Sequence, residues 1–400
     1  MKVALFTWEY PPKIVGGIAR HVYGLTRALS KIGVETLVFT CEFPGAPREE
    51  KTDGVRIFRV DSYRAPTPDL ATWDLVMNQS MEETAAEIID SENEPVDLLH
   101  AHEWLVAKAS IGLKHTLRLP LVATMHATEY GRRNGLHDDN ERMIHDTEHW
   151  LTFEAWRLVC CSSFMTDHVS WVFSLPRQKI DVIPNGVDVT EFVGTFQKSS
   201  FRRLYALPEE KIVLFVGRLV YEKGASLLVE AVPRVLARAN AKFVFVGEGY
   251  MKEQLIARAK QLGVAEKTYF TGYVDEKTLK QLYRVANVCV FPSLYEPFGI
   301  VALEAMAARV PVVVADMGGF SEIVEHDRTG VKVYPNNVES LAWGILRVLT
   351  DDGHANYLQA NAARKVLEEY SWDQIAARTK KVYERVVDEY RKAGWNPAST

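Results

Sequence analysis

Short apolar runs alternate with longer stretches of helical periodicity along the whole chain. Such runs are typical of strands buried on both faces, and the amphipathic stretches between them are typical of helices that connect parallel strands. The first half contains the runs Val3–Thr7, Glu35–Thr40, Val55–Val60, Leu98–Ala101, Leu121–Thr124, Leu158–Cys161 and Lys179–Ile183. The second half contains the runs Ile212–Val216, Lys242–Val246, Thr268–Thr271, Val288–Phe291 and Val310–Ala315. The pattern predicts an α/β protein with two Rossmann-like, doubly wound domains.

A cluster of turn-forming residues separates the two series of strands. It is Pro184-Asn185-Gly186-Val187-Asp188, and the polar stretch Gly194–Arg203 follows it. Because a chain of 400 residues is too long for one ordinary core, we place a hinge here, between domains 1–190 and 200–372. The remaining segment is 373–400, and a predicted helix, Trp372–Ala393, accounts for most of it; this helix either caps the second domain or returns to the first.

Composition narrows the class of protein. With 47% hydrophobic residues, 25% charged residues and a net charge of -5, the chain is typical of soluble globular proteins and not of general nucleic-acid binders. No uncharged run reaches the roughly 18 residues that a membrane span needs, and Met1–Phe6 lacks the pattern of a signal peptide. The cysteines form no CxxC pair and lie mostly in apolar runs, so we expect small core residues and a cytoplasmic location: Cys41, Cys160, Cys161 and Cys289.

One segment is strongly acidic. Residues 65–107 contain no Lys or Arg but carry Asp69, Asp74, Glu82, Glu83, Glu87, Asp90, Glu92, Glu94, Asp97 and Glu103. Anionic lipid headgroups would repel such a surface, which favours a soluble acceptor over a lipid. A merely solvated helix face explains the same pattern equally well.

Two carboxylates bracket a turn that follows the apolar run Val288–Phe291. The turn, Glu296-Pro297-Phe298-Gly299, leads into a helix whose first amides, at Ile300 and Val301, are suited to a diphosphate. Glu304, more than one turn further on, is suited to a pair of ribose hydroxyls, whereas Glu296 lies where a sugar would be. For two Glu at this spacing alone, a capped, solvated helix is the simpler interpretation, and the other motifs decide.

Two further loops carry features suited to phosphate. Gly16-Gly17 begins a helix after the first strand, with Lys13 nearby, but matches neither Walker A nor G-x-G-x-x-G. Arg218 and Lys223 share the loop after Ile212–Val216 and match the charge of a diphosphate leaving group. Because the chain also contains no Asp-x-Asp, we expect charge stabilisation without a metal.

Aromatic and histidine side chains follow other strands. Tyr273 offers a ring to a nucleobase, although rim packing is the commoner role of such a residue. His100 and His102 alternate onto one face without a third metal ligand at a recognisable spacing, so we expect no metal there. His126, at a strand terminus beside a polar loop, is the better candidate for contacting substrate.

Together the motifs resemble those of the retaining glycosyltransferases of the GT-B fold, in particular family 4 and the related glycogen and starch synthases. The resemblance covers nearly the whole chain and comprises Lys13-x-x-Gly16-Gly17, His126, Pro184–Asp188, Arg218 with Lys223, Gly272-Tyr273, Glu296 to Glu304 and Tyr370-Ser371-Trp372. The segment His126–Arg132 is similar to bacterial α-glucan synthases within family 4.

The resemblance implies roles for individual residues. Gly17, Lys13, Arg218, Lys223 and the amides after Gly299 would hold the donor diphosphate, Glu304 the ribose, and Tyr273 the base. Glu296 and His126 would contact the transferred sugar, and the catalytic set would be Glu296, His126, Arg218 and Lys223. Glu9, Glu103 and Arg132 are further candidates for contacts to sugar or acceptor. The family also implies that the domains face an interdomain cleft, that the last helix returns to the N-terminal domain, and that no cofactor is needed.

The predicted function is retaining transfer of glucose from ADP-glucose or UDP-glucose to an α-glucan or related acceptor. Two departures from the starch-type synthases favour family 4 and leave the acceptor open: Lys13-Ile14-Val15-Gly16-Gly17 replaces Lys-x-Gly-Gly, and Phe298 replaces Cys. The alternatives are family 4 transfer to another acceptor (sucrose or trehalose synthesis, glucose 1-phosphate, a lipid-linked sugar), a sugar-nucleotide epimerase, and a non-catalytic sensor. The sequence does not address oligomeric state.

Overall fold

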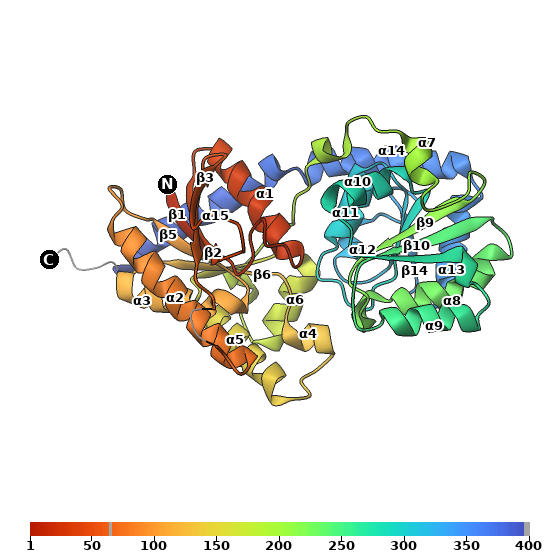
Figure 1. Ribbon diagram of the computed structural model, residues 1–400. Helices are drawn as coiled ribbons and strands as arrows, with labels where there is room; N and C mark the ends of the chain where they lie inside the picture. The colour runs from red at the N-terminus through yellow and green to blue at the C-terminus, as the bar shows by residue number, and fades with distance from the viewer. Residues whose placement is uncertain (64–65, 396–400) are drawn as a thin grey trace. The chain divides into compact units, whose positions relative to one another are not determined.

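The computed structural model describes residues 1–63 and 66–395 (Figure 1). Ala65 of the acidic segment and residues 396–400 of the predicted last segment lie outside the described residues. The chain divides into two compact units, of which the second is Val187–Ser371 and the first contains Met1–Gly186 and the chain from Trp372 onward. Each unit is built on a largely parallel sheet with helices on both faces, so the predicted α/β class is confirmed.

The sheet of the first unit has the strand order β3-β4-β2-β1-β5-β6-β7-β8. Every residue of its central strands β1, β5 and β6 is buried, as expected for parallel strands covered on both faces. Among the described strands of this sheet, only the edge pair β3 and β4 is antiparallel. The strands are β1 (Lys2–Phe6), β2 (Glu35–Cys41), β3 (Glu49–Thr52), β4 (Val55–Val60), β5 (Leu98–His102), β6 (Leu121–Met125), β7 (Arg157–Cys160) and β8 (Ile180–Val182).

Helices cover both faces of this sheet (Figure 1). They are α1 (Gly17–Lys31), α2 (Leu70–Asp90), α3 (Ala107–Leu117), α4 (Glu129–Arg133), α5 (Asp139–Glu154), α6 (Ser163–Val172) and α15 (Trp372–Ala393). The last helix, α15, packs beside α1, and its residues share one apolar core with Val3, Leu98 and Val122 of the sheet. The C-terminal helix is therefore an integral part of the first unit.

Trp372 at the start of α15 packs where two glycines leave room for its ring. A Cβ at Gly24 in α1 would lie 2.1 Å from the indole, and one at Gly186 would lie 2.6 Å from it. Both glycines therefore permit a close approach that any larger residue would block.

Gly24→Ala tests this packing. Ala favours a helix interior over Gly by about 1 kcal/mol, but the clash with Trp372 outweighs that gain, so we expect the free energy of unfolding to fall by about 1–3 kcal/mol. Urea denaturation measures the change. In Gly112→Ala, on α3, the nearest atoms to the new Cβ belong to the flexible end of the Glu82 side chain, so this control should stay close to wild type. A Gly24→Ala protein as stable as wild type would contradict the packing argument.

The sheet of the second unit has the order β11-β10-β9-β12-β13-β14 and is entirely parallel. Its strands are β9 (Lys211–Val216), β10 (Ala241–Val246), β11 (Thr268–Gly272), β12 (Val288–Phe291), β13 (Val312–Ala315) and β14 (Val331–Val333). Its helices are α7 (Lys198–Arg202), α8 (Ala225–Leu236), α9 (Lys252–Gln261), α10 (Glu276–Val285), α11 (Ile300–Ala307), α12 (Phe320–Ile323), α13 (Val338–Leu349) and α14 (Asp352–Glu369). Helices α8, α9 and α13 lie on one face, and α10 and α11 on the other (Figure 1).

Two strands were missing from the prediction. β3 has the sequence Glu-Glu-Lys-Thr, with no apolar residue to mark it. Its signal lay in the following turn, because Asp53-Gly54 adopts positive φ at both residues, and Asp-Gly between two extended segments is a strong hairpin mark. β14 is only three residues long.

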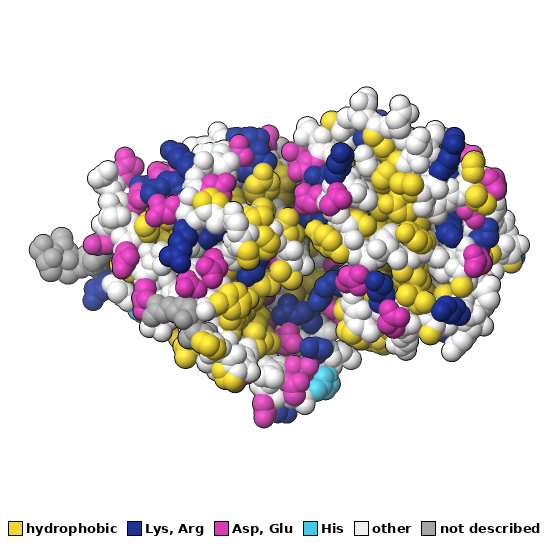
Figure 2. Space-filling model, in the orientation of Figure 1, with side chains coloured by type: hydrophobic (Ala, Val, Ile, Leu, Met, Phe, Trp, Pro, Cys, Tyr) yellow, Lys and Arg dark blue, Asp and Glu magenta, His cyan; other side chains and the backbone are white. Residues whose placement is uncertain are grey.

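Two composition-based expectations concern burial and the membrane. All four cysteines are buried and free, which confirms them as small core residues. Among the described residues, no helix combines the length and apolar character that crossing a membrane requires. On the face shown in Figure 2, acidic and basic side chains are interspersed over both units.

Candidate functional site

The second unit brings its predicted donor-binding residues to one edge of its sheet. Strand β9 lies between β10 and β12, so the order of strands reverses beside it. Ligands of doubly wound sheets bind outside the carboxyl ends of the strands at such a switch point. Arg218 and Lys223 follow β9, whereas Glu296, Gly299 and Glu304 follow β12. The two motifs therefore meet at the switch point.

Backbone contacts tie the loops of this edge together. The carbonyl of Glu222 accepts hydrogen bonds from the amides of Leu294 (2.8 Å) and Tyr295 (3.3 Å). The carbonyl of Glu296 accepts one from the amide of Gly319, which follows β13 (2.9 Å). The loops after β9, β12 and β13 thus form one connected rim.

Lys223 and Glu296 form an ion pair on this rim. Lys223 Nζ donates to Glu296 Oε2 at 2.8 Å, and the Ser293 hydroxyl donates to the same oxygen at 3.2 Å. Gly224 ends the Lys223 turn at φ 67°, where a Cβ would lie 2.0 Å from the carbonyl oxygen of Pro292. The loop therefore needs glycine at that position to bring Lys223 against the β12 loop.

The side chains of Arg218 and Tyr273 are strongly exposed to solvent. The Arg218 side chain is 60% exposed and pairs with Glu222 at 3.1 Å. Tyr273 follows β11, two strands away from β9, and is 77% exposed. Arg218 thus lies beside the predicted diphosphate site, whereas the structure sets Tyr273 at a distance along the sheet edge.

Glu304 is held inside α11. It is buried, and the Tyr283 hydroxyl from α10 donates to its Oε2 at 2.9 Å. The helix begins after Gly299, which has a φ of 107°. A Cβ at this position would lie 2.2 Å from the ring of Phe320, so the position requires glycine. The first amides of the helix, at Ile300 and Val301, lie where the intrahelical ladder has no acceptor for them. Tyr283 fixes the direction of this carboxylate, a role that sequence spacing did not reveal.

In the first unit, Glu9 holds the glycine turn. Its carboxylate accepts hydrogen bonds from the amides of Val15 (2.6 Å), Gly16 (2.9 Å) and Ala19 (3.3 Å). Glu9 is 1% exposed, and burial raises the pKa of its carboxyl against the effect of these bonds. Glu9 therefore positions the turn that leads into α1, and its expected contact with sugar or acceptor stays a prediction.

The other two residues of this motif stand at the loop and the helix start. Lys13 places Nζ over the ring of Trp8, 5.0 Å from its centroid. Gly17 is the first residue of α1, after an extended Gly16. The motif thus keeps a cation and the amide end of a 15-residue helix within one loop.

Four histidines gather where β1, β5 and β6 meet α1 and α15. Both ring nitrogens of His100 have a hydrogen-bond partner. Nδ1 lies 2.6 Å from the Tyr383 hydroxyl of α15, and Nε2 lies 2.7 Å from the Thr124 hydroxyl. His102 follows on the same face, with ring centroids 4.2 Å apart. His100 therefore anchors α15 to the sheet, whereas His102 turns toward the next strand.

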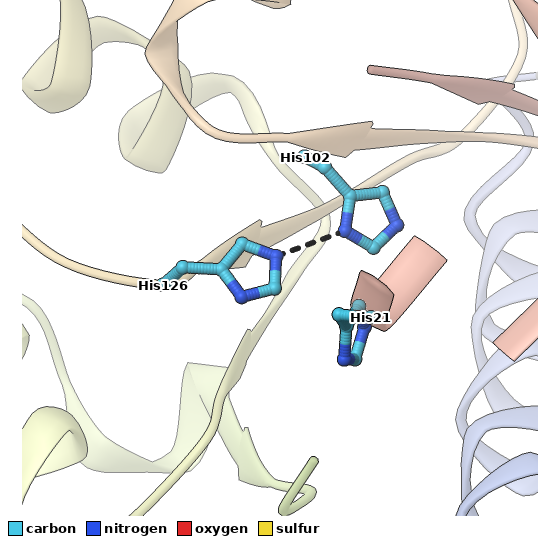
Figure 3. Close-up of side chains that lie close together, drawn as sticks. All are labelled: His21, His102 and His126. Atoms are coloured by element: carbon cyan, nitrogen blue, oxygen red, sulfur yellow. Dashed lines mark hydrogen bonds between the residues drawn. The ribbon is translucent and has the colours of Figure 1, made fainter. Parts of the chain in front are cut away.

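His102, His126 and His21 lie close together (Figure 3). His102 Nδ1 and His126 Nε2 are 3.1 Å apart, and the ring of His21, from α1, is 4.8 Å from that of His126. Burial lowers the pKa of His21 to about 4 and those of His102 and His126 well below the ordinary value, and the neighbouring rings add to the effect for the latter two. The imidazoles are accordingly neutral at pH 7.

The Glu103 carboxylate holds the backbone of the loop that begins at His126. Its Oε1 accepts hydrogen bonds from the amides of His126 (2.6 Å) and Ala127 (2.8 Å). Glu103 itself adopts φ 71°, a strained conformation for a residue with a Cβ. Glu103 is 3% exposed and positions His126, and its expected contact with sugar or acceptor stays a prediction.

Arg132 is the cation of a buried carboxylate network. It donates to Glu129 at 2.9 Å and to Glu148 at 3.4 Å, and Glu148 in turn accepts the amide of Glu129. Burial raises the pKa of Glu148 well above its usual value, and Arg132 only partly opposes it. Burial acts to lower the pKa of Arg132, but the carboxylates of Glu103, Glu148 and Glu129 outweigh it and raise that pKa. Arg132 thus offsets the buried carboxylates of this unit, and its expected contact with sugar or acceptor stays a prediction.

Glu103→Ala tests the Glu103 clamp, by which we mean the two hydrogen bonds from the amides of His126 and Ala127 to the Glu103 carboxylate. It leaves two amides without their acceptor, each worth about 1–3 kcal/mol when buried, so we expect the free energy of unfolding to fall by about 2–4 kcal/mol. Glu103→Gln keeps an acceptor oxygen and should retain most of the stability. Urea denaturation distinguishes the two variants, and equal losses in both would show that the amide contacts are not what the side chain contributes.

Part of the acidic segment is also structural. The Asp74 side chain is fully buried and pairs with Lys108, and Asp69 caps α2 by accepting the amide of Thr72 at 2.8 Å. Glu92 pairs with Lys2 at 2.7 Å. These contacts weaken the inference that the segment repels lipid, because several of its charges serve the fold.

Comparison with known proteins places the chain in a family. The family model described as Glycosyltransferase Family 4 matches residues 15–191, and the model described as Glycosyl transferases group 1 matches residues 197–365. An uncharacterized glycosyltransferase of Methanocaldococcus jannaschii is 43% identical over 96% of this chain and 98% of its own. The chain belongs to the family 4 glycosyltransferases.

Two further similar proteins support this family assignment. A glycogen synthase of Mycobacterium tuberculosis is 34% identical over 96% of this chain and 94% of its own. The structure of sucrose-phosphate synthase from Thermosynechococcus elongatus superposes with a TM-score of 0.82 at 24% identity, covering 97% of this chain and 99% of that one. This family 4 glycosyltransferase therefore has the GT-B fold, as expected from its motifs.

Proposed function

We propose that the protein is a retaining glycosyltransferase that moves glucose from a nucleotide-diphosphate glucose to an α-glucan or related acceptor. The observation that carries the proposal is the meeting of Arg218 and Lys223 with Glu296 and Glu304 at the switch point of the second unit. Two cations suit the diphosphate and two carboxylates suit hydroxyls, which is the polarity of a nucleotide sugar. The 34% identity to a glycogen synthase supports glucose as the sugar.

Each donor group has a proposed residue in the second unit. The first-turn amides after Gly299, with Arg218 and Lys223, stabilise the charge that develops on the diphosphate as the sugar bond breaks. Glu304, oriented by Tyr283, binds the ribose hydroxyls. Glu296 binds hydroxyls of the hexose, and Tyr273 offers its exposed ring to the base.

The chemistry requires no nucleophile from the protein. We propose attack at the same face of the sugar from which the phosphate leaves, with the leaving phosphate accepting the acceptor's proton. The protein then contributes positioning and charge stabilisation. In the first unit, His126 contributes a neutral imidazole, held by the Glu103 clamp, for contact with the sugar.

A substrate matrix tests the proposal. Purified protein is incubated with ADP-glucose, UDP-glucose or GDP-mannose, each with glycogen, maltose, glucose 1-phosphate or no acceptor. Released nucleotide and the linkage of the product are measured. Acceptor-dependent release with an α-linked glucan product supports the proposal. Turnover with glucose 1-phosphate alone indicates a different family 4 acceptor, and conversion of the donor without any acceptor indicates an epimerase.

A further inference from the structure

Three histidines from separate parts of the first unit form a compact group of potential metal ligands. His21 comes from α1, His102 ends β5, and His126 follows β6, and one ring nitrogen of each lies within 4.8 Å of those of the other two (Figure 3). Within residues 1–63 and 66–395, this is the one group of three or more His, Cys, Asp or Glu side chains close enough to hold a metal ion together. Sequence spacing cannot show it, because the three positions are 81 and 24 residues apart.

Two nitrogens of the group lack a hydrogen-bond partner. His21 Nδ1 and His102 Nε2 are buried, and neither is bonded to any part of the chain that the structure describes. Asn185 lies beside His21 as a hydrogen-bond partner that acts to raise the pKa of the imidazole, but its Oδ1 is buried without a bond of good geometry to any of those residues. Buried polar atoms are nearly always paired, and a metal ion bound at His21 Nδ1 would satisfy that atom, whereas His102 offers Nδ1 to the ion and keeps Nε2 outside the coordination. His100, next to the group, has both nitrogens bonded and needs none.

The donor set indicates which ion fits. Three imidazoles without a carboxylate suit Zn²⁺, Cu²⁺ or Ni²⁺, and they disfavour Mg²⁺ and Ca²⁺, which need oxygen ligands. Zn–N bonds of about 2.0–2.1 Å in a tetrahedron separate two ligand nitrogens by about 3.3 Å. His102 Nδ1 and His126 Nε2 are already 3.1 Å apart, so only His21 has to move closer.

We propose that His21, His102 and His126 bind one borderline divalent metal ion of the Zn²⁺ class, and that the bound ion inhibits the enzyme. The hydrogen that His102 and His126 share moves to an outer ring nitrogen, so both rings remain neutral as ligands. Three histidines leave a fourth coordination position for water. Inhibition rests on the proposed function, because a metal-bound His126 no longer reaches the sugar.

Metal binding is tested directly on the full-length protein. Chelator-treated protein is titrated with Zn²⁺ against a competing chromophoric chelator. We expect one ion per chain, at least tenfold weaker binding in His21→Gln and in His102→Gln, and no change in His149→Gln, which removes an exposed histidine outside the group. Equal affinity in wild type, His21→Gln and His102→Gln would overturn the proposal.

Spectroscopy on the unmodified chain guards against variants that do not fold. Co²⁺ substituted at the site should give the strong visible absorption of a four-coordinate ion, and X-ray absorption of the Zn²⁺ form should show three imidazole ligands. The weak absorption of six-coordinate Co²⁺, or fewer than two imidazoles, would refute the site.

An inhibition assay separates this inference from the proposed function. With the donor and acceptor that support turnover, Zn²⁺ should inhibit the wild type and His149→Gln equally, and His21→Gln should need at least tenfold more Zn²⁺. Metal binding without transferase activity would contradict the proposed function but not the site. Transfer that Zn²⁺ leaves unaffected, in a protein that binds no metal, would contradict the site alone.

Discussion

Glu296→Gln is expected to lower kcat for sugar transfer by about 10²–10³-fold, since it removes a charged contact to the hexose in the transition state. The carboxylate is buried and holds Lys223 at 2.8 Å, so two groups of the rim lose their arrangement together. Gln keeps the size and one acceptor oxygen, so the second unit should still fold. kcat at saturating donor and urea denaturation measure the two effects separately. Glu296→Ala should be at least as severe.

The control for this prediction is Glu209→Gln. Glu209 is an exposed carboxylate of the same unit that precedes β9, at the opposite end of this strand from the switch point, so its neutralisation should leave kcat and stability unchanged. A Glu296→Gln protein with kcat within threefold of wild type, and folded, would remove Glu296 from the catalytic set.

Arg218→Ala and Lys223→Ala are each expected to reduce kcat/KM by about 10²–10³-fold, because each removes a cation that offsets charge on the leaving diphosphate. Their effects on stability should differ. Within the part of the chain that the structure describes, the ion pair of Arg218 is an exposed one with Glu222, and such pairs contribute about 0–1 kcal/mol. Lys223→Ala leaves the buried Glu296 without its cation, so this variant should also be less stable.

Arg258→Ala provides the matched control. Arg258 forms an exposed pair with Glu230 at 2.6 Å in the same unit, so its removal reproduces the loss of an Arg–Glu pair without touching the switch point. Steady-state kinetics with varied donor compare the variants. Near-wild-type turnover in folded Arg218→Ala, Lys223→Ala and Glu296→Ala proteins would refute the proposed donor site.

The strands of both sheets were predictable because parallel strands are buried on both faces and leave uninterrupted apolar runs. β1, β4 and β12 begin at or within one residue of their predicted starts. The edge strands β3 and β14 were missed, since a half-exposed or very short strand has little apolar signal. The donor motifs of the second unit were predictable for a related reason: the residues of each motif are local in sequence, following a single strand.

Three predicted site residues have a supporting role that the sequence did not show, because it depends on distant partners. The resemblance made Glu9, Glu103 and Arg132 candidates for contacts to sugar or acceptor. In the structure Glu9 and Glu103 hold backbone amides of neighbouring loops, and Arg132 neutralises buried carboxylates. A polar side chain near a site looks the same in sequence whether it faces the ligand or supports the loop beneath it.

By itself, the sequence determined the two α/β sheets and the family, together with the local motifs around Arg218, Lys223, Glu296 and Glu304. These follow from hydrophobic periodicity and from short-range spacing, both of which a linear pattern contains. Only the tertiary structure decided which charges pair, which carboxylates are buried, and that His21 joins His102 and His126. Those facts depend on side chains brought together by helix and strand packing over long sequence separations, and no local pattern encodes them.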